Sequence, residues 1–129
     1  MWHQLAQNPQ AISSIYKSVP PLQRTRLSVL SLMEDGPALR LHFHPTEFPE
    51  VIPARWARQQ FNRVMIELHF YGLNGLKVSG WSTQNEVNLS IVPLDANRRQ
   101  LRLQSSSCQL ETEFEFFTIA KVEGYQAGE

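Results

Sequence analysis

Apolar and polar residues alternate along most of this chain, from about residue 22 to residue 123. The pattern is clear in "ALRLHF" (residues 38–43), "VMIELHF" (64–70) and "EVNLSIV" (86–92). Successive side chains of a strand point to opposite faces of its sheet, so this alternation is typical of strands with one buried face. The sequence therefore predicts a mostly β fold.

Seven or eight alternating segments follow one another at short intervals, which favours mainly antiparallel pairing. Two hairpins are predicted, with turns at residues 34–37 and 72–75, where Asp-Gly and Asn-Gly supply turn conformations. A length of 129 residues is typical of one domain. We expect a single domain, residues 1–129. Its antiparallel β region should span residues 22–123 as a curled sheet, a sandwich or a partial barrel, followed by a tail at 124–129.

One short helix is expected before the β region, over residues 8–17. Asn8 can cap the free amides of a first turn, and Pro9 suits that turn because its missing N–H costs nothing there. Three apolar residues then follow at helical spacing, Ile12, Ile15 and Tyr16. This short amphipathic helix is predicted to pack against the sheet.

Charge and composition narrow the possible functions. Lys plus Arg equal Asp plus Glu at 12 each, so no net charge attracts nucleic acid or an anionic membrane. No apolar run approaches the roughly 20 residues of a membrane span, and the single cysteine, Cys108, excludes an internal disulfide. We expect a cytoplasmic protein that binds neither nucleic acid nor membrane. Self-association is left open.

No group of residues predicts a catalytic centre. The sequence lacks a G-x-S-x-G nucleophile elbow and a glycine-rich phosphate loop. His42 and His44 lie two apart on a predicted strand and could bind one metal ion with Glu47 or His69, but a solvated strand face explains them better. The sequence thus predicts no enzyme, no cofactor and no metal. A metal-dependent enzyme using His42, His44 and His69 is a minor alternative.

A row of glutamates marks the stretch "CQLETEFEFF" (108–117). Alternation places Glu111, Glu113 and Glu115 on one face. On the opposite face it places Cys108, Leu110, Thr112, Phe114 and Phe116. Stacked carboxylates repel unless a base such as Arg102 on the preceding strand offsets them. A solvent face is the simpler interpretation, and the alternative is a surface that complements a basic partner.

A second candidate contact surface lies in residues 45–61. This segment holds three prolines, so it is predicted to be a long loop and not an interior strand. It carries Arg55, Trp56 and Arg58, and Trp and Arg are enriched among residues that dominate interface energies. The competing interpretation is that Trp56 anchors the loop to the core.

Several short motifs occur in an order that resembles a known protein family. They are Trp2, Asp35-Gly36-Pro37, Phe48-Pro49, the run F-N-x-V-x-x-E-L-x-F-x-G from Phe61 to Gly72, Ser79-Gly80-Trp81 and finally Cys108. Together they resemble the immunity protein 50 family of bacterial polymorphic toxin systems. The resemblance covers residues 1 to about 123.

This resemblance implies a cytoplasmic, mostly β protein without catalytic activity that binds and neutralises a cognate toxin domain. It supplies no toxin-contacting residue position by position. The glutamate row and the Arg55, Trp56 and Arg58 loop are therefore two candidate toxin-binding surfaces of opposite charge. The alternative function is a non-enzymatic β domain that binds a small ligand or peptide.

Overall fold

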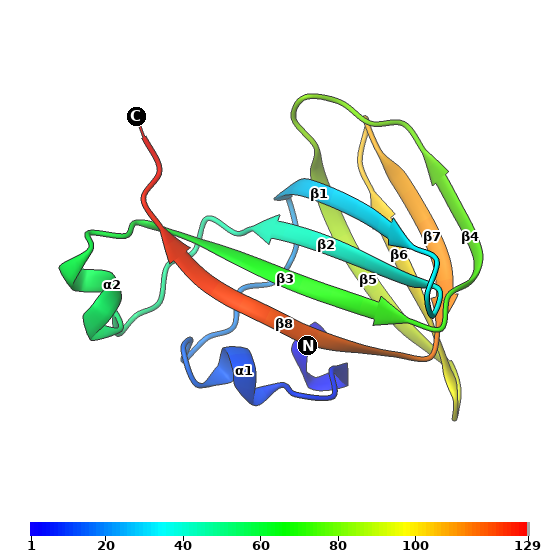
Figure 1. Cartoon of the computed structure of the whole chain (residues 1–129), viewed down its shortest axis with the longest axis horizontal. Helices are drawn as coiled ribbons and strands as arrows, with labels where there is room; N and C mark the ends of the chain where they lie inside the picture. The colour runs from blue at the N-terminus through cyan, green and yellow to red at the C-terminus, as the bar shows by residue number, and fades with distance from the viewer. Residues whose placement is uncertain (129) are drawn as a thin grey trace.

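The computed structural model describes residues 1–128 and contains one antiparallel sheet that curls without closing (Figure 1). Its strands are β1 (Thr25–Met33), β2 (Ala38–His44), β3 (Arg63–Tyr71), β4 (Asn74–Ser79), β5 (Glu86–Asp95), β6 (Arg98–Gln104), β7 (Gln109–Phe114) and β8 (Phe116–Tyr125). Their order across the sheet is β4-β7-β6-β5-β1-β2-β3-β8. The prediction of a mostly antiparallel β fold is confirmed, and the curled sheet is the correct alternative.

The inner face of the sheet carries the core. Alternate residues of the strands are buried there, as predicted for Leu39, Leu41 and Phe43 of β2. Phe70 stacks on Phe117 with ring centroids 5.0 Å apart and meets Phe114 edge to face at the same centroid distance. Full burial of such a side chain stabilises the fold by about 1.5–3 kcal/mol. The curl of the sheet is thus filled by side chains from both of its ends.

The predicted second hairpin is wrong, because β3 and β4 do not pair with each other. Tyr71 of β3 pairs with Phe116 of β8, and Asn74 of β4 pairs with Glu113 of β7. The run from β3 to β4 and the run from β7 to β8 therefore form one long ladder that bends at a corner, visible where these strands meet in Figure 1. The Gly-Leu-Asn-Gly segment forms a bend between β3 and β4. These two strands then pair with β8 and β7, which lie far away in the sequence.

The same corner shifts the alternation of side chains after β7. Phe114 is buried, but the next buried phenylalanine is Phe117, because Glu115 lies between the two strands at the bend. Phe116 instead stacks on Tyr71 with ring centroids 4.9 Å apart. The prediction that Phe116 shares the buried face with Phe114 is wrong.

The N-terminal segment is less helical than predicted. In place of a helix over residues 8–17 it has a 3-10 turn, η1 (Trp2–Leu5), and a short helix, α1 (Gln10–Ser13), which lies alongside β8 (Figure 1). The Asn8 side chain does not cap this helix. Its amide donates to the Ile119 carbonyl at 2.9 Å, and its carbonyl accepts from the Ile119 amide at 2.8 Å. Asn8 thus ties the segment to the edge strand β8, which extends to Tyr125 and so into the predicted tail.

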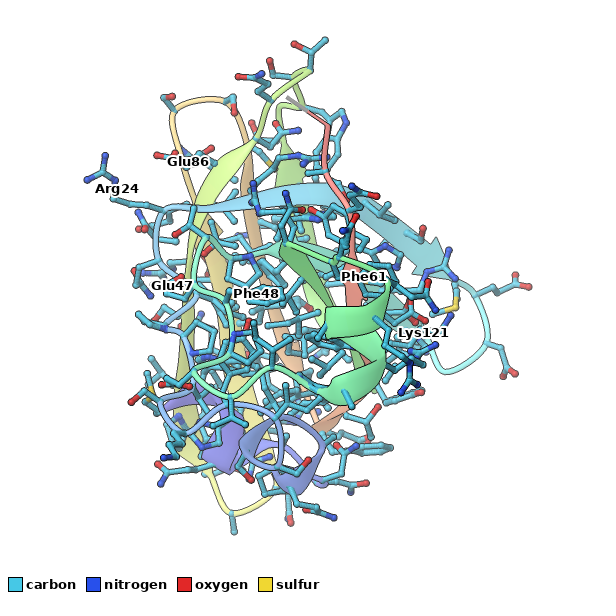
Figure 2. The ribbon with its side chains drawn as sticks, turned by 90° about the vertical axis from the view of Figure 1, so that its left-hand side faces the viewer. Arg24, Glu47, Phe48, Phe61, Glu86 and Lys121 are labelled. Carbon is cyan, nitrogen blue, oxygen red and sulfur yellow. The ribbon has the colours of Figure 1, made fainter. Side chains whose placement is uncertain are left out.

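The proline-rich segment contains one short helix, α2 (Ala54–Arg58). Trp56 is buried, with 4% of its surface exposed, and Phe48 packs beside its ring at a centroid distance of 6.0 Å. A Cβ on Gly124 of β8 would meet ring atoms of Trp56 and Phe61 at 2.7 Å, so the bare glycine backbone makes room for both rings. Phe48 and Phe61 are labelled in the view onto α2 in Figure 2.

Candidate functional site

The glutamate row is balanced by basic neighbours on the outer face of the sheet, which is the face turned away from the core. Glu113 pairs with Arg98 at 2.7 Å. Glu111 lies 3.4 Å from Arg102 and also accepts a hydrogen bond from the Gln100 amide at 3.1 Å. Arg102, the base that the sequence offered to offset the row, thus offsets Glu111, and Arg98 offsets Glu113. The row is therefore part of a mixed-charge surface and not a purely acidic one.

Glu115 is separated from the other two glutamates by the corner. It is exposed and lies between β7 and β8, where a Cβ on Gly72 would meet its Cγ and Cδ atoms at 2.7 Å. Gly72 also has φ +70, a region that L residues rarely adopt. The Glu115 side chain therefore packs over the bend of β3 into β4.

The members of the second candidate surface, Arg55, Trp56 and Arg58, differ in their exposure to solvent. Arg55 and Arg58 are exposed on α2, whereas Trp56 points into the core. A partner could not reach the indole without displacing Phe48 and opening this end of the sheet. The anchoring interpretation of Trp56 agrees with its burial, and only Arg55 and Arg58 are available on this surface.

Two histidines of the outer face share one carboxylate. Glu67 is buried, and its Oε1 and Oε2 atoms lie 2.8 Å from the Nε2 of His42 and 2.6 Å from the Nε2 of His69. Burial opposes ionisation of Glu67, but the hydrogen bond from His69 and the two imidazole charges outweigh it and lower its pKa. His69 also approaches the Tyr71 hydroxyl at 3.3 Å. His42 and His69, on the same sheet, therefore compensate the charge of the buried Glu67 carboxylate.

His44 belongs to a separate hydrogen-bonded chain. Its Nε2 lies 2.6 Å from the Ser28 hydroxyl and its Nδ1 lies 2.8 Å from the Tyr125 hydroxyl. Burial, followed by the charges of Arg26, Arg63 and His42, lowers the pKa of His44 to about 4. Both ring nitrogens of His44 are engaged, so it does not share a site with His42. Within residues 1–128, no group of three or more His, Cys, Asp or Glu side chains is arranged to hold a metal ion.

Sequence reasoning missed a group of arginines on the outer face of β1, β2 and β3. They are Arg26, Arg40 and Arg63. Arg26 pairs with His44 across the β1–β2 ladder, Arg40 with His69 across β2–β3, and Arg63 with Tyr125 across β3–β8. Within the described part of the chain, none of the three has a carboxylate within 4.0 Å. The arginines come from three different strands, so only the strand order reveals that they share one face.

Trp81 stands beside this face on the loop between β4 and β5. Half of its surface is exposed, and it lines a groove of about 560 Å³ together with Arg26 and Ser28. The loop is fixed by buried Asn85, whose side chain accepts from the Ser82 amide at 2.9 Å and donates to the Ser82 carbonyl at 2.8 Å. Gly80, with φ +81, passes directly against the Ser107 carbonyl oxygen. An exposed indole is therefore presented from a rigid loop.

Comparison with known proteins places this fold in a family. No helix among residues 1–128 has the length and apolarity needed to cross a bilayer. No curated protein and no solved structure matches the chain. The family model described as immunity protein 50 matches residues 8–125, a span that holds all eight strands and both α-helices of the described residues. The chain therefore belongs to the immunity protein 50 family.

Proposed function

We propose that this protein is an immunity protein that binds and neutralises a cognate toxin domain in the bacterial cytoplasm, without catalytic activity of its own. The observation that carries the proposal is the family match over residues 8–125. An immunity protein of this kind acts by occupying its partner's surface. Its function then depends on a folded surface of complementary shape and charge and not on a reactive group.

The fold supplies a rigid support for such a surface. Side chains on the outer face are held at fixed spacing by cross-strand pairs such as Arg102 with Glu111. Groups held in place before binding lose little freedom on contact, which favours tight association. The sequence suggested two groups of toxin contacts, Glu111, Glu113 and Glu115 in one and Arg55, Trp56 and Arg58 in the other. We keep all of them as candidates except the buried Trp56.

The test is capture of the partner followed by protection from it. The tagged protein is purified from its source cells, and the copurified protein is identified by mass spectrometry. That partner is then expressed in a test strain with and without the immunity protein. A stoichiometric partner whose toxicity is abolished supports the proposal.

A variant with Glu111, Glu113 and Glu115 all changed to lysine is run beside the wild type. Loss of protection with unchanged folding would assign the glutamate row to the interface. Unchanged protection would remove the row from the candidates. If no partner copurifies and no toxicity is relieved, the proposal fails, and binding of a small ligand or peptide becomes the better interpretation.

A further inference from the structure

We propose that the toxin docks through acidic side chains onto one specific surface, the Arg-aromatic face. We define this face by Arg26, Arg40, Arg63, Tyr71, Trp81 and Tyr125. The inference rests on the proposed function, because it identifies where the cognate toxin binds and which side chains it uses. It favours this surface over both candidates suggested by the sequence.

The first argument is unbalanced positive charge. Arg26, Arg40 and Arg63 are the cations of this face that have no carboxylate partner within residues 1–128, and the carboxylates beside them are engaged by other groups. Glu67 is held between two histidines, Glu123 lies 3.9 Å from Lys121, and Glu86 lies 3.8 Å from Arg24. Figure 2 labels Arg24 and Glu86 at the rim of the sheet. Guanidinium groups without a carboxylate partner are suited to paired contacts with carboxylates of a binding protein.

The face formed by β6 and β7 provides the contrast within the same molecule. There Arg98 and Arg102 have their own carboxylates, Glu113 and Glu111. On the Arg-aromatic face the Nε atoms of Arg40 and Arg63 are buried and lack any hydrogen-bond partner within the described residues. Arg40 makes one long hydrogen bond within the protein, from its Nη2 to the Ser31 hydroxyl at 3.4 Å, and no carboxylate neutralises either guanidinium group among the described residues. The uncompensated charge of these guanidinium groups favours an anionic partner.

The second argument is the kind of residue that is exposed. Trp, Tyr and Arg are the side chains most enriched among those that dominate binding energy at protein interfaces. Trp81 is half exposed above a groove that Arg26 also lines. Ser28 also lines this groove, and its hydroxyl lies 2.6 Å from His44, which in turn lies 2.8 Å from the Tyr125 hydroxyl. The Trp81 indole and the Arg26 guanidinium therefore line the same groove, where both can contact a partner.

The two tyrosines of this face disfavour nucleic acid as the partner. Binding to single strands needs open ring faces on which bases stack. One face of Tyr71 is covered by Phe116, at an interplanar angle of 21°, and Tyr125 meets His44 edge to face. Their hydroxyls are directed to His69 and His44. We therefore commit to the acidic surface of a protein as the occupant.

The experiment measures binding of the purified toxin domain to four single variants by isothermal titration calorimetry. Arg26→Glu is compared with Lys17→Glu, which reverses an exposed charge beside α1. Trp81→Ala is compared with Leu94→Ala, which removes an equally exposed apolar side chain from the end of β5. Arg26→Glu and Trp81→Ala should each weaken binding by about 30-fold or more, and the controls by less than about threefold. Wild-type affinity should also fall as salt rises.

The results of these binding measurements distinguish failure of the inferred docking surface from failure of the proposed function. If the toxin binds the wild type but Arg26→Glu and Trp81→Ala bind as well as their controls, the inference is wrong while the proposed function stands. If a single-stranded oligonucleotide binds as tightly as the toxin and this binding is lost in Arg26→Glu, the face recognises nucleic acid and the inference is also wrong. If the wild type does not bind the toxin, the proposed function and the inference fail together. Thermal unfolding of every variant shows that binding losses are not losses of folding.

Discussion

Asn8 and Ile119 exchange a pair of hydrogen bonds across 111 positions of the chain, with the Asn8 side chain taking the place of a neighbouring strand. The Gln7 amide adds a third bond to the Phe117 carbonyl at 3.0 Å. An edge strand with open backbone groups invites pairing with other molecules. The N-terminal segment therefore blocks part of the β8 edge.

Asn8→Ala should destabilise the protein by about 1–3 kcal/mol, because it leaves the Ile119 amide and carbonyl without their partner. The measurement is the free energy of unfolding in urea. Asn97→Ala is the control, since Asn97 is exposed in the turn between β5 and β6 and its side chain makes no hydrogen bond within residues 1–128. Equal stability of the two variants would contradict the role of Asn8.

Gly80 and Gly75 form a matched pair of glycines. Both have positive φ, +81 and +68, but a Cβ on Gly75 would meet nothing within 4 Å, whereas one on Gly80 would collide with the Ser107 carbonyl oxygen. Gly75→Ala should cost about 1–2 kcal/mol through backbone strain alone. Gly80→Ala should cost a further 1–3 kcal/mol or so, because backbone must move to admit the methyl group. Chemical denaturation of both variants measures the difference, and equal costs would refute this account.

Removal of the Trp56 ring should change the stability of the protein far more than removal of the Trp81 ring. Trp56→Ala leaves a cavity beside Phe48 and Gly124 and should destabilise the protein by about 3–5 kcal/mol. Trp81→Ala should change stability by less than about 0.5 kcal/mol, because the indole is half exposed. Calorimetric melting of the two variants makes the comparison. A large loss for Trp81→Ala would mean that its ring is part of the core.

The stability of the protein should fall as the pH is lowered from 6.5 toward 4, partly because of His44. Burial and the nearby charges of Arg26, Arg63 and His42 lower its pKa from 6.5 to about 4 in the folded protein. The unfolded chain therefore gains a proton in this range that the folded protein does not. The stabilisation from neutral His44 is complete above pH 6.5 and is lost as the pH approaches 4.

Comparison with His44→Gln isolates this contribution. Unfolding free energies are measured for both proteins at pH 7 and pH 5. The decrease between these two values should be smaller in the variant, which has no imidazole to protonate. Glu67 contributes little to the comparison, because its pKa is lowered from an ordinary value of 4.5 and it stays ionised across this range. An identical decrease in both proteins would show that His44 is not the group responsible.

Local signals in the sequence predicted the elements better than their partners. The Asp35-Gly36 turn and the alternation of Leu39, Leu41 and Phe43 correctly predicted the first hairpin, because both signals act between neighbours in the chain. Gly72 and Gly75 gave an equally strong turn signal, but β4 pairs with β7. Asn8 likewise has a side chain that could cap a helix, but its hydrogen bonds are made to the backbone of Ile119 in β8. Such choices depend on distant segments that periodicity does not reveal.

The candidate site was the harder part to predict for the same reason. The balance between Glu111 and Arg102 was accessible because their strands are consecutive. The Arg-aromatic face joins residues from β1, β2, β3, β8 and one loop, and each of its arginines looks ordinary within its own strand. Trp56 and Trp81 both stand near glycine or arginine in the sequence, yet one is buried and the other exposed. Their sequence neighbours do not distinguish the two tryptophans. The fold does, because it places the bare backbone of Gly124 against the ring of Trp56.

The corner between β3 and β4 has a consequence for how the chain acquires its structure. Tyr71 and Asn74 find their partners in residues 116 and 113, so a growing chain that ends before β7 leaves β4 with nothing to pair with. Both halves of the sheet gain their last strands from one late run of sequence. Synthesis must therefore be nearly finished before either half is complete, and the two halves are expected to fold together in one cooperative, comparatively slow step dominated by non-local contacts.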